Sequence, residues 1–155
     1  MEARILDIGA GPIDDASRMR RLSRVTLVVR DYDEAIEYYR SVLGFYLLED
    51  RPLPSENKRW VVMAPEADSP VSFVLGRAAN ADQESRVGNQ TGGRVFLFLE
   101  TDDLERDYQA LVTRGVVFVR PPQRFDYGRV AVFEDLYGNL WDLVEPAKRP
   151  TMQMT

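Results

Sequence analysis

The sequence contains two similar halves, and this repeat constrains the fold more than any other feature. Residues 25–45 read VTLVVRDYDEAIEYYRSVLGF, and residues 95–118 read VFLFLETDDLERDYQALVTRGVVF. Each segment begins with an apolar run typical of a strand, continues through an Asp-rich turn into a helical pattern, and reaches a glycine that ends the helix. Asp31 or Asp33 can cap the first helix, and residues 101–103 (TDD) can cap the second. We therefore predict an internal duplication.

The segments after each copy also match in order, since three further apolar runs follow each predicted helix. These runs are 45–50, 59–64 and 71–76 in the first copy, and 116–120, 128–134 and 140–145 in the second. Both copies thus give the order strand, helix, strand, strand, strand, which predicts an α+β fold. A polar segment rich in small residues separates them. We predict an N-terminal arm (1–21), a first βαβββ module (22–77), a linker (78–93), a second βαβββ module (94–147) and a C-terminal tail (148–155).

Composition limits the chemistry that this chain can perform. The 155 residues include no Cys and no His. Disulfides, thiolate catalysis and Cys-based zinc sites are therefore excluded, and the commonest metal ligand and general base is missing. The net charge is −5 and the basic residues are not clustered, so we expect no nucleic-acid partner. No apolar run approaches the ~18 residues of a membrane span, and the N-terminus has no secretory signal, so we expect a cytoplasmic protein without a membrane partner.

Strand alternation predicts which side chains face away from the helices. In the first strand Val25, Leu27 and Val29 form the face that packs on the helix, which leaves Arg24 and Thr26 on the other face. The same reasoning, with the aromatic residues of neighbouring strands, predicts ligand contacts from Arg24, Thr26, Trp60, Phe73, Phe96, Phe98, Glu100 and Asp142. A mostly apolar surface with a few polar groups is the usual profile of a small-molecule site. The alternative is a filled core with charges at its rim.

The chain resembles the vicinal oxygen chelate superfamily, which includes glyoxalase I, bleomycin-resistance proteins and extradiol dioxygenases. The resemblance covers residues 22–147 and rests on two motifs in order, VTLVVRDYDEAIEYYRSVLGF and VAVFEDLYGNLWDLVEP. It implies that the two modules form a cupped eight-stranded mixed sheet with the helices outside. It also implies a divalent metal in the cup of the family's enzymes, and a homodimer. Whether the modules pair within one chain or across a dimer stays open.

The family's metal positions carry over poorly to this sequence. The resemblance places them at Arg24 and Phe96 on the first strands, and at Phe73 and Asp142 on the last strands. Only Asp142 has a ligand to offer, because a guanidinium has no lone pair and phenylalanine has no donor atom. Glu100 is a second carboxylate on the predicted face, and two carboxylates can hold Mg²⁺ or Mn²⁺ through waters. Arg24 can instead take the place of the metal, either pairing with Asp142 or binding a ligand carboxylate or phosphate.

We therefore expect no cofactor, and a protein that binds or sequesters a small molecule in the sheet cup without a metal. Within the resembled family, bleomycin-resistance proteins act by sequestration of this kind. The alternative is a divergent metal-dependent lyase, isomerase or dioxygenase that uses Asp142, Glu100 and water as ligands. A module that only binds other proteins is a third interpretation. We assign no catalytic residue, because no nucleophile with a base partner is visible, and we favour a binding protein over an enzyme.

Overall fold

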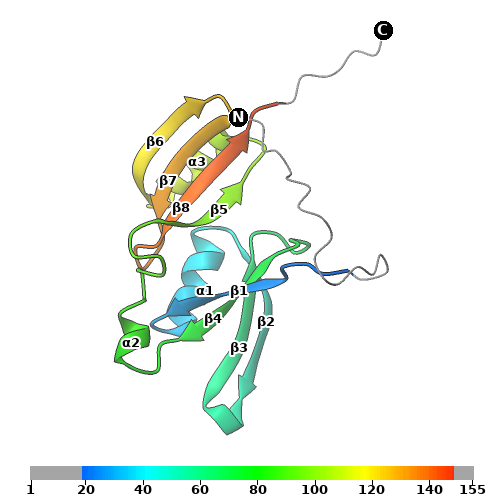
Figure 1. Cartoon of the computed structure of the whole chain (residues 1–155), viewed down its shortest axis with the longest axis vertical. Coiled ribbons are helices and arrows are strands. Elements are labelled where there is room, and N and C mark those ends of the chain that lie inside the picture. Colours follow the sequence, from blue (N-terminus) through cyan, green and yellow to red (C-terminus); the bar gives the residue numbers. More distant parts are fainter. Residues whose placement is uncertain (1–18, 149–155) are drawn as a thin grey trace, which may run out of the picture.

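A computed structural model of the chain describes residues 19–148, which form two modules stacked along the long axis of the molecule (Figure 1). The elements of the first module are β1 (Arg24–Val29), α1 (Tyr32–Ser41), β2 (Tyr46–Leu53), a 3₁₀ turn η1 (Pro54–Glu56), β3 (Lys58–Ala64) and β4 (Ser72–Arg77). Its four strands lie in the order β1-β4-β3-β2. Strands β1 and β4 are parallel, and the other neighbours are antiparallel.

The second module repeats this connectivity. Its elements are β5 (Val95–Glu100), α3 (Leu104–Thr113), β6 (Val117–Phe125), β7 (Gly128–Glu134) and β8 (Leu140–Pro146). Its sheet has the order β5-β8-β7-β6, again with the first and last strands of the module, β5 and β8, paired in parallel. The prediction of an α+β fold built from two βαβββ modules with eight mixed strands is confirmed. The segment predicted as a linker contains a short helix, α2 (Ala81–Glu84), which the sequence pattern did not indicate.

Side-chain packing, not strand pairing, joins the two modules, since the eight strands form two separate sheets. Helix α1 lies at the end of the first module that faces the second (Figure 1). The ring of Tyr39 in α1 lies 5.5 Å from that of Phe73 in its own module and 6.3 Å from that of Trp141 in β8. Phe73, Trp141 and Leu143 belong to one buried hydrophobic cluster. The helix-covered sides of both sheets therefore share a single core.

A buried carboxylate, Asp135, stands at the centre of this junction. Its side chain accepts hydrogen bonds from the Tyr39 hydroxyl at 2.6 Å, the Trp141 indole at 3.1 Å and the Asn139 amide at 2.9 Å. It also accepts the backbone N–H groups of Tyr137 and Asn139, both at 3.0 Å. Burial and the neighbouring Asp135 charge raise the pKa of Tyr39 well above its usual range. The Asp135 carboxylate thus stabilises the turn before β8, and its hydrogen bond with Tyr39 links α1 to the second module.

Because the covered sides meet in one core, the opposite side of each sheet is open. On β1, Leu27 and Val29 are fully buried while Arg24 and Thr26 are exposed, which confirms the predicted alternation. We call the side with Arg24, Thr26, Glu49, Arg51 and Trp60 the first open face. The side with Phe98, Arg120, Val132, Leu140 and Asp142 is the second open face.

The side chains that we expected to line one cavity lie on two separate surfaces of the chain, because the modules meet through their covered sides. The predicted N-terminal arm and C-terminal tail lie almost entirely outside the described residues. None of the helices between residues 19 and 148 has the length and apolar content needed to cross a bilayer.

Candidate functional site: the two open sheet faces

The first open face is organised around Trp60 on β3. The indole N–H of Trp60 donates a hydrogen bond of 2.7 Å to the Glu49 carboxylate on β2. The guanidinium carbons of Arg24 and Arg51 each lie 5.9 Å from the centre of the Trp60 ring. Arg51 stands directly opposite Trp60 in the β2–β3 pair, whereas Arg24 comes from β1, on the other side of β4. Both cations lie within the range of an attractive cation–π contact.

The arginines on this face differ from those on the covered side of the same sheet. Arg59, the neighbour of Trp60 in sequence, pairs with Asp33 at 2.8 Å and with Asp50 at 2.7 Å. Between residues 19 and 148, Arg24 and Arg51 make no ion pair and no side-chain hydrogen bond. The predicted ion pair between Arg24 and Asp142 is therefore not formed within one chain, because these residues lie on different open faces.

The second open face has a hollow of about 460 Å³. It is lined by Gly93, Arg94, Val95, Phe98, Val119, Arg120, Val132, Leu140 and Asp142. The Phe98 side chain is 69% exposed, and Asp142 stands beside it in the parallel pair of β5 and β8. Covering a large exposed aromatic side chain removes more apolar area from water than covering a small apolar residue. An exposed aromatic side chain next to a polar group therefore favours contact with a ligand or a partner.

The half-buried Asp142 carboxyl makes no ion pair with any residue that the structure describes. Its burial raises the pKa of the Asp142 carboxyl, and the positive charge of Arg120 opposes this shift. A carboxylate that has lost part of its water and has gained no close partner is poorly stabilised. A ligand that donates a hydrogen bond to Asp142 would relieve this cost.

The other predicted site residues are divided between the faces, the core and one end of the second sheet. Thr26 and Trp60 lie on the first open face, and Glu100 is exposed at the end of β5. Phe73 was placed wrongly, since it is 4% exposed and packs against Tyr39 in the core. The prediction was one residue out of phase on β4, where Val74 stands opposite Thr26.

Phe96 was also placed wrongly, for a different reason. The register of β5 against β8 shifts between Val95 and Leu97, which is a β-bulge. A bulge inserts an extra residue and resets the alternation of side chains. Val95 consequently lines the hollow on the second open face, and Phe96 packs against the core.

Sequence reasoning missed Glu49, Arg51 and Arg120. Glu49 was placed in a strand but given no function, and Arg51 lies beyond the predicted end of that strand at residue 50, whereas β2 continues to Leu53. A register shift between Leu47 and Glu49 also hides which residues of β2 face Trp60. Arg120 ended a predicted strand, so a search for charges on that strand would have found it.

The residues at the family's metal positions do not fit a divalent metal. Arg24 has no lone pair, Phe96 is turned toward the core, and Val74 replaces Phe73 on the open face without adding a donor. Asp142 remains as one carboxylate, with Arg120 as its charged neighbour. In the chain from residue 19 to residue 148, no group of three or more Asp and Glu side chains comes together in a way that could hold a metal ion.

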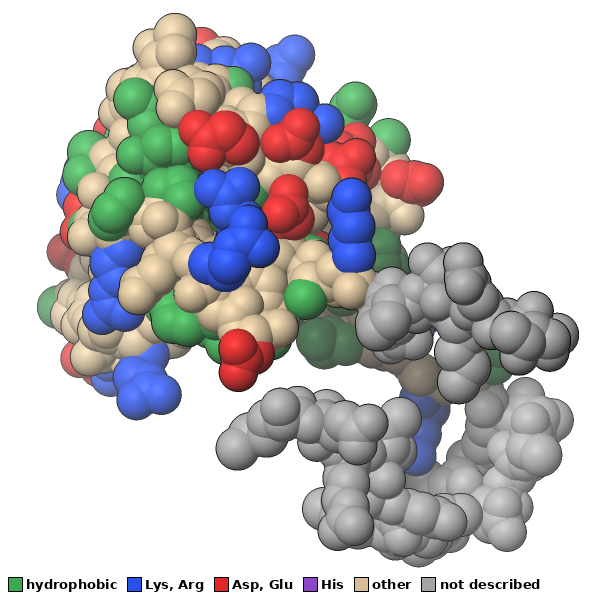
Figure 2. All heavy atoms as spheres, turned by 90° about the horizontal axis from the view of Figure 1, so that it is seen from above, with side chains coloured by type: hydrophobic (Ala, Val, Ile, Leu, Met, Phe, Trp, Pro, Cys, Tyr) green, Lys and Arg blue, Asp and Glu red, His purple; other side chains and the backbone are tan. Residues whose placement is uncertain are grey.

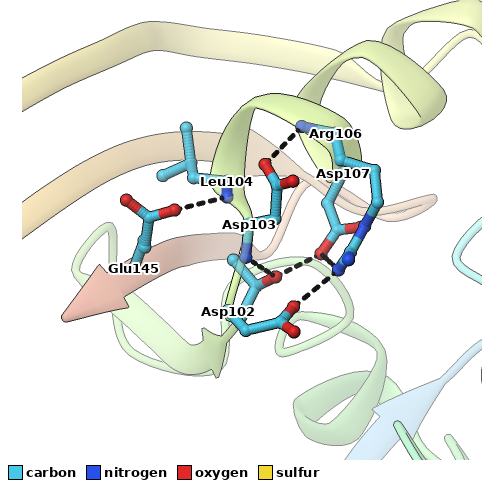
Figure 3. A network of polar contacts seen from close by, with 7 residues as sticks. Asp102, Asp103, Leu104, Arg106, Asp107 and Glu145 are labelled. Carbon is cyan, nitrogen blue, oxygen red and sulfur yellow. Dashed lines mark hydrogen bonds and ion pairs between the residues drawn. The ribbon is translucent and has the colours of Figure 1, made fainter.

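Two larger hollows lie outside the open faces. One of about 890 Å³ is at the end of the second sheet, and one of about 490 Å³ lies between the end of α1 and α3. Some of their charged side chains are engaged within the protein: Arg106 pairs with Asp102 and Asp107, and the Glu145 carboxylate accepts the Leu104 N–H at the start of α3 (Figure 3). The surface seen in Figure 2 has acidic and basic side chains interspersed, without a large patch of either sign.

Comparison with known proteins agrees with this architecture. Residues 21–143 match the model of the Glyoxalase/Bleomycin resistance protein/Dioxygenase superfamily. A protein of Shewanella frigidimarina is 56% identical over 121 residues, which are 78% of this chain and 90% of that protein. The crystal structure of UcmS2 has a TM-score of 0.71 and 27% identity, covering 82% of this chain and 98% of its own. That of TnmS3, an antibiotic binding protein from Streptomyces, has a TM-score of 0.67 and 29% identity, covering 83% and 98%.

Proposed function

The chain belongs to the Glyoxalase/Bleomycin resistance protein/Dioxygenase superfamily, and on this premise we propose that it binds and sequesters a small molecule against its open sheet faces without a metal. One observation carries the proposal. On the second open face, Phe98, which is 69% exposed, stands beside the half-buried Asp142 at a hollow of about 460 Å³, and Asp142 makes no ion pair with any described residue. An apolar contact surface with a few polar groups, here Asp142, Arg94 and Arg120, is suited to a small organic ligand.

The similarity to TnmS3 supports this interpretation, because that protein is an antibiotic binding protein and its fold covers most of this chain. The available metal ligands support the absence of a metal, since Asp142 is the one carboxylate at the positions that bind the metal in the family's enzymes. Binding by sequestration needs neither a nucleophile nor a general base. This fits a chain that has no Cys and no His.

The proposal includes a homodimer in the cytoplasm. Each open face is a single sheet surface, which a partner molecule can cover. If the first open face of one chain stands opposite the second open face of its partner, the eight strands around each ligand form a cup. Trp60 and Arg24 of one chain then face the hollow beside Phe98 of the other.

Two measurements test the proposal. Protein without a His tag is incubated with Zn²⁺, Mn²⁺, Ni²⁺ and Fe²⁺, dialysed, and analysed by plasma mass spectrometry; we expect far less than one equivalent of any metal. Thermal shift against a library of aromatic compounds then identifies ligands, because a ligand that binds only the native state raises the melting temperature.

Paired variants make the second measurement specific. Phe98→Ser removes the exposed ring of the hollow and should abolish the shift. Val112→Ser, which alters an exposed residue on α3 away from the open faces, should preserve it. A stoichiometric metal that is lost in Asp142→Ala would contradict the proposal and favour a divergent metal-dependent lyase, isomerase or dioxygenase.

A further inference from the structure

The first open face has an excess of positive charge that the residues described by the structure do not neutralise. Arg24 and Arg51 both lie against Trp60, and Glu49 is the carboxylate bonded to this group. The Glu49 carboxylate accepts the indole N–H of Trp60, which fixes the orientation of the ring. Two guanidinium groups and one carboxylate leave a net positive charge beside an aromatic ring.

Comparison with Arg59 shows that this arrangement is not general for the arginines of the sheet. Arg59 donates to Asp50 through both Nε and Nη2 and to Asp33 through Nη1, so both sides of its guanidinium are occupied. Among the described residues, no side chain and no backbone carbonyl accepts a hydrogen bond from the guanidinium of Arg24 or Arg51. Their planar donor groups are exposed next to Trp60.

The geometry points to a ligand class: an aromatic compound with an oxyanion, such as a carboxylate, whose oxygens are bound by Arg24 and Arg51 while its ring packs beside Trp60. A guanidinium presents parallel N–H donors that match the two oxygens of a carboxylate. The aromatic part gains from contact with the indole ring and with the flat faces of the guanidinium groups. This inference rests on the proposed small-molecule binding and adds the charge and shape of the ligand.

A cationic ligand suits this face poorly. It would meet two guanidinium groups, and the carboxylate that could attract it, Glu49, already accepts the Trp60 N–H at 2.7 Å. The second open face does not contradict this preference. Its Asp142 carboxyl has a raised pKa and stands near Arg120, so it can bind the polar, uncharged part of the same ligand.

The test uses three naphthalene probes with one ring system and different charges: 2-naphthoate, naphthalene-2-carboxamide and 2-naphthylmethylamine. The full-length protein has two tryptophans, and Trp141 is 2% exposed, so quenching of the accessible fluorescence reports on Trp60. Titration calorimetry provides an independent dissociation constant. We expect 2-naphthoate to bind about tenfold more tightly than the carboxamide, as a charge-assisted hydrogen bond predicts, and the amine to bind most weakly.

Three variants locate the interaction. Arg24→Gln and Arg51→Gln should each reduce the affinity for 2-naphthoate about tenfold and leave the affinity for the carboxamide nearly unchanged. Arg40→Gln removes an exposed charge from α1 and should have no effect on either probe. Arg51→Lys keeps the positive charge but loses the parallel N–H donors of the guanidinium, so it should bind 2-naphthoate more tightly than Arg51→Gln and more weakly than the wild type. Because these side chains are exposed, melting temperatures should show that the variants are folded.

Two results would overturn the inference while leaving the proposed function intact. In the first, all three probes bind equally and Phe98→Ser weakens each of them. In the second, 2-naphthoate does not bind, whereas a neutral or cationic compound from the thermal-shift library does. If no compound of any charge binds and the protein retains a stoichiometric metal, the proposed function itself fails.

Discussion

The two modules have the same backbone plan but different open faces. Both helices begin with an aspartate cap: Asp31 accepts the Glu34 N–H at 2.9 Å, and Asp103 accepts the Arg106 N–H at 3.0 Å. Both helices are followed by a glycine with positive φ, +75° at Gly44 and +86° at Gly115, where other residues are strained. Both sheets place their first and last strands side by side and parallel.

The residues that differ are those on the open faces. Thr26 and Val74 stand side by side in the first module, and Phe98 and Asp142 stand side by side in the second. The first face is arranged around Trp60 and two guanidinium groups, and the second has an exposed phenyl ring and a carboxyl; none of these charged groups makes an ion pair between residues 19 and 148. The positions that set the backbone are therefore similar in both halves, while the positions that can meet a ligand are not. This difference suits a protein that holds one asymmetric molecule between two dissimilar surfaces.

A second contrast lies in the turns before the last strands. The turn of residues 135–139 is closed by the buried Asp135, which is 6% exposed and accepts five hydrogen bonds. In the first module, the equivalent connection between β3 and β4 contributes no buried carboxylate. The junction between the modules thus depends on a group that belongs to one half alone.

Replacing Asp135 should have the largest effect on stability. Asp135→Ala leaves the Tyr39 hydroxyl and the Trp141 indole without an acceptor, so we expect a loss of about 2–6 kcal/mol, because each buried donor without a partner costs about 1–3 kcal/mol. Tyr39→Phe removes one donor and leaves the others, so its cost should be about 1.5–3 kcal/mol. Urea unfolding measures both values. A loss below that of Tyr39→Phe would show that Asp135 does not hold the modules together.

The helix caps should give smaller and equal effects in the two modules. Asp31→Ala and Asp103→Ala each remove one cap hydrogen bond, and each should cost about 1 kcal/mol in urea unfolding. Figure 3 shows that α3 has extra support, because Arg106 also pairs with Asp102 and Asp107. A much larger cost at one cap would show that the two halves do not share this feature energetically.

The repeat explains why the fold could be predicted and the details of the faces could not. The strand and helix order follows from local patterns that occur twice, so each copy supports the interpretation of the other. Face assignments depend on strand phase, and a bulge changes that phase without a sequence signal. Phe96 was misplaced at such a bulge.

The sequence also could not predict which charged side chains lie close together. Arg24 and Asp142 were expected to meet because both were placed in one cup. Which sides of the sheets meet in the core depends on long-range contacts such as that between Tyr39 and Trp141. The interaction of Arg51 with Trp60 depends in turn on the register of β2 and β3.

Replacing Asp142 should have the smallest effect on stability. Unlike the substitutions above, it should stabilise the protein. Burial raises the pKa of this carboxyl in the folded protein, so its ionised form is disfavoured there. The stability that the protonated form contributes is complete below the unfolded pKa and is lost as pH rises through the folded pKa. Asp142→Asn should therefore raise the melting temperature at pH 7, and this gain should shrink when the pH is lowered into the range where the wild-type carboxyl is protonated.

Asp102 provides the matched control in the same module. A hydrogen bond and ion pair with Arg106 lower the pKa of the Asp102 carboxyl, so its contribution is present above the unfolded pKa and disappears as the pH falls. Asp102→Asn should then lower the melting temperature slightly at pH 7 and have no effect in acid. If Asp142→Asn also lowers the melting temperature at pH 7, Asp142 has a cationic partner that residues 19–148 of one chain do not provide, and the first open face of a second copy, with Arg24, is where to look for it.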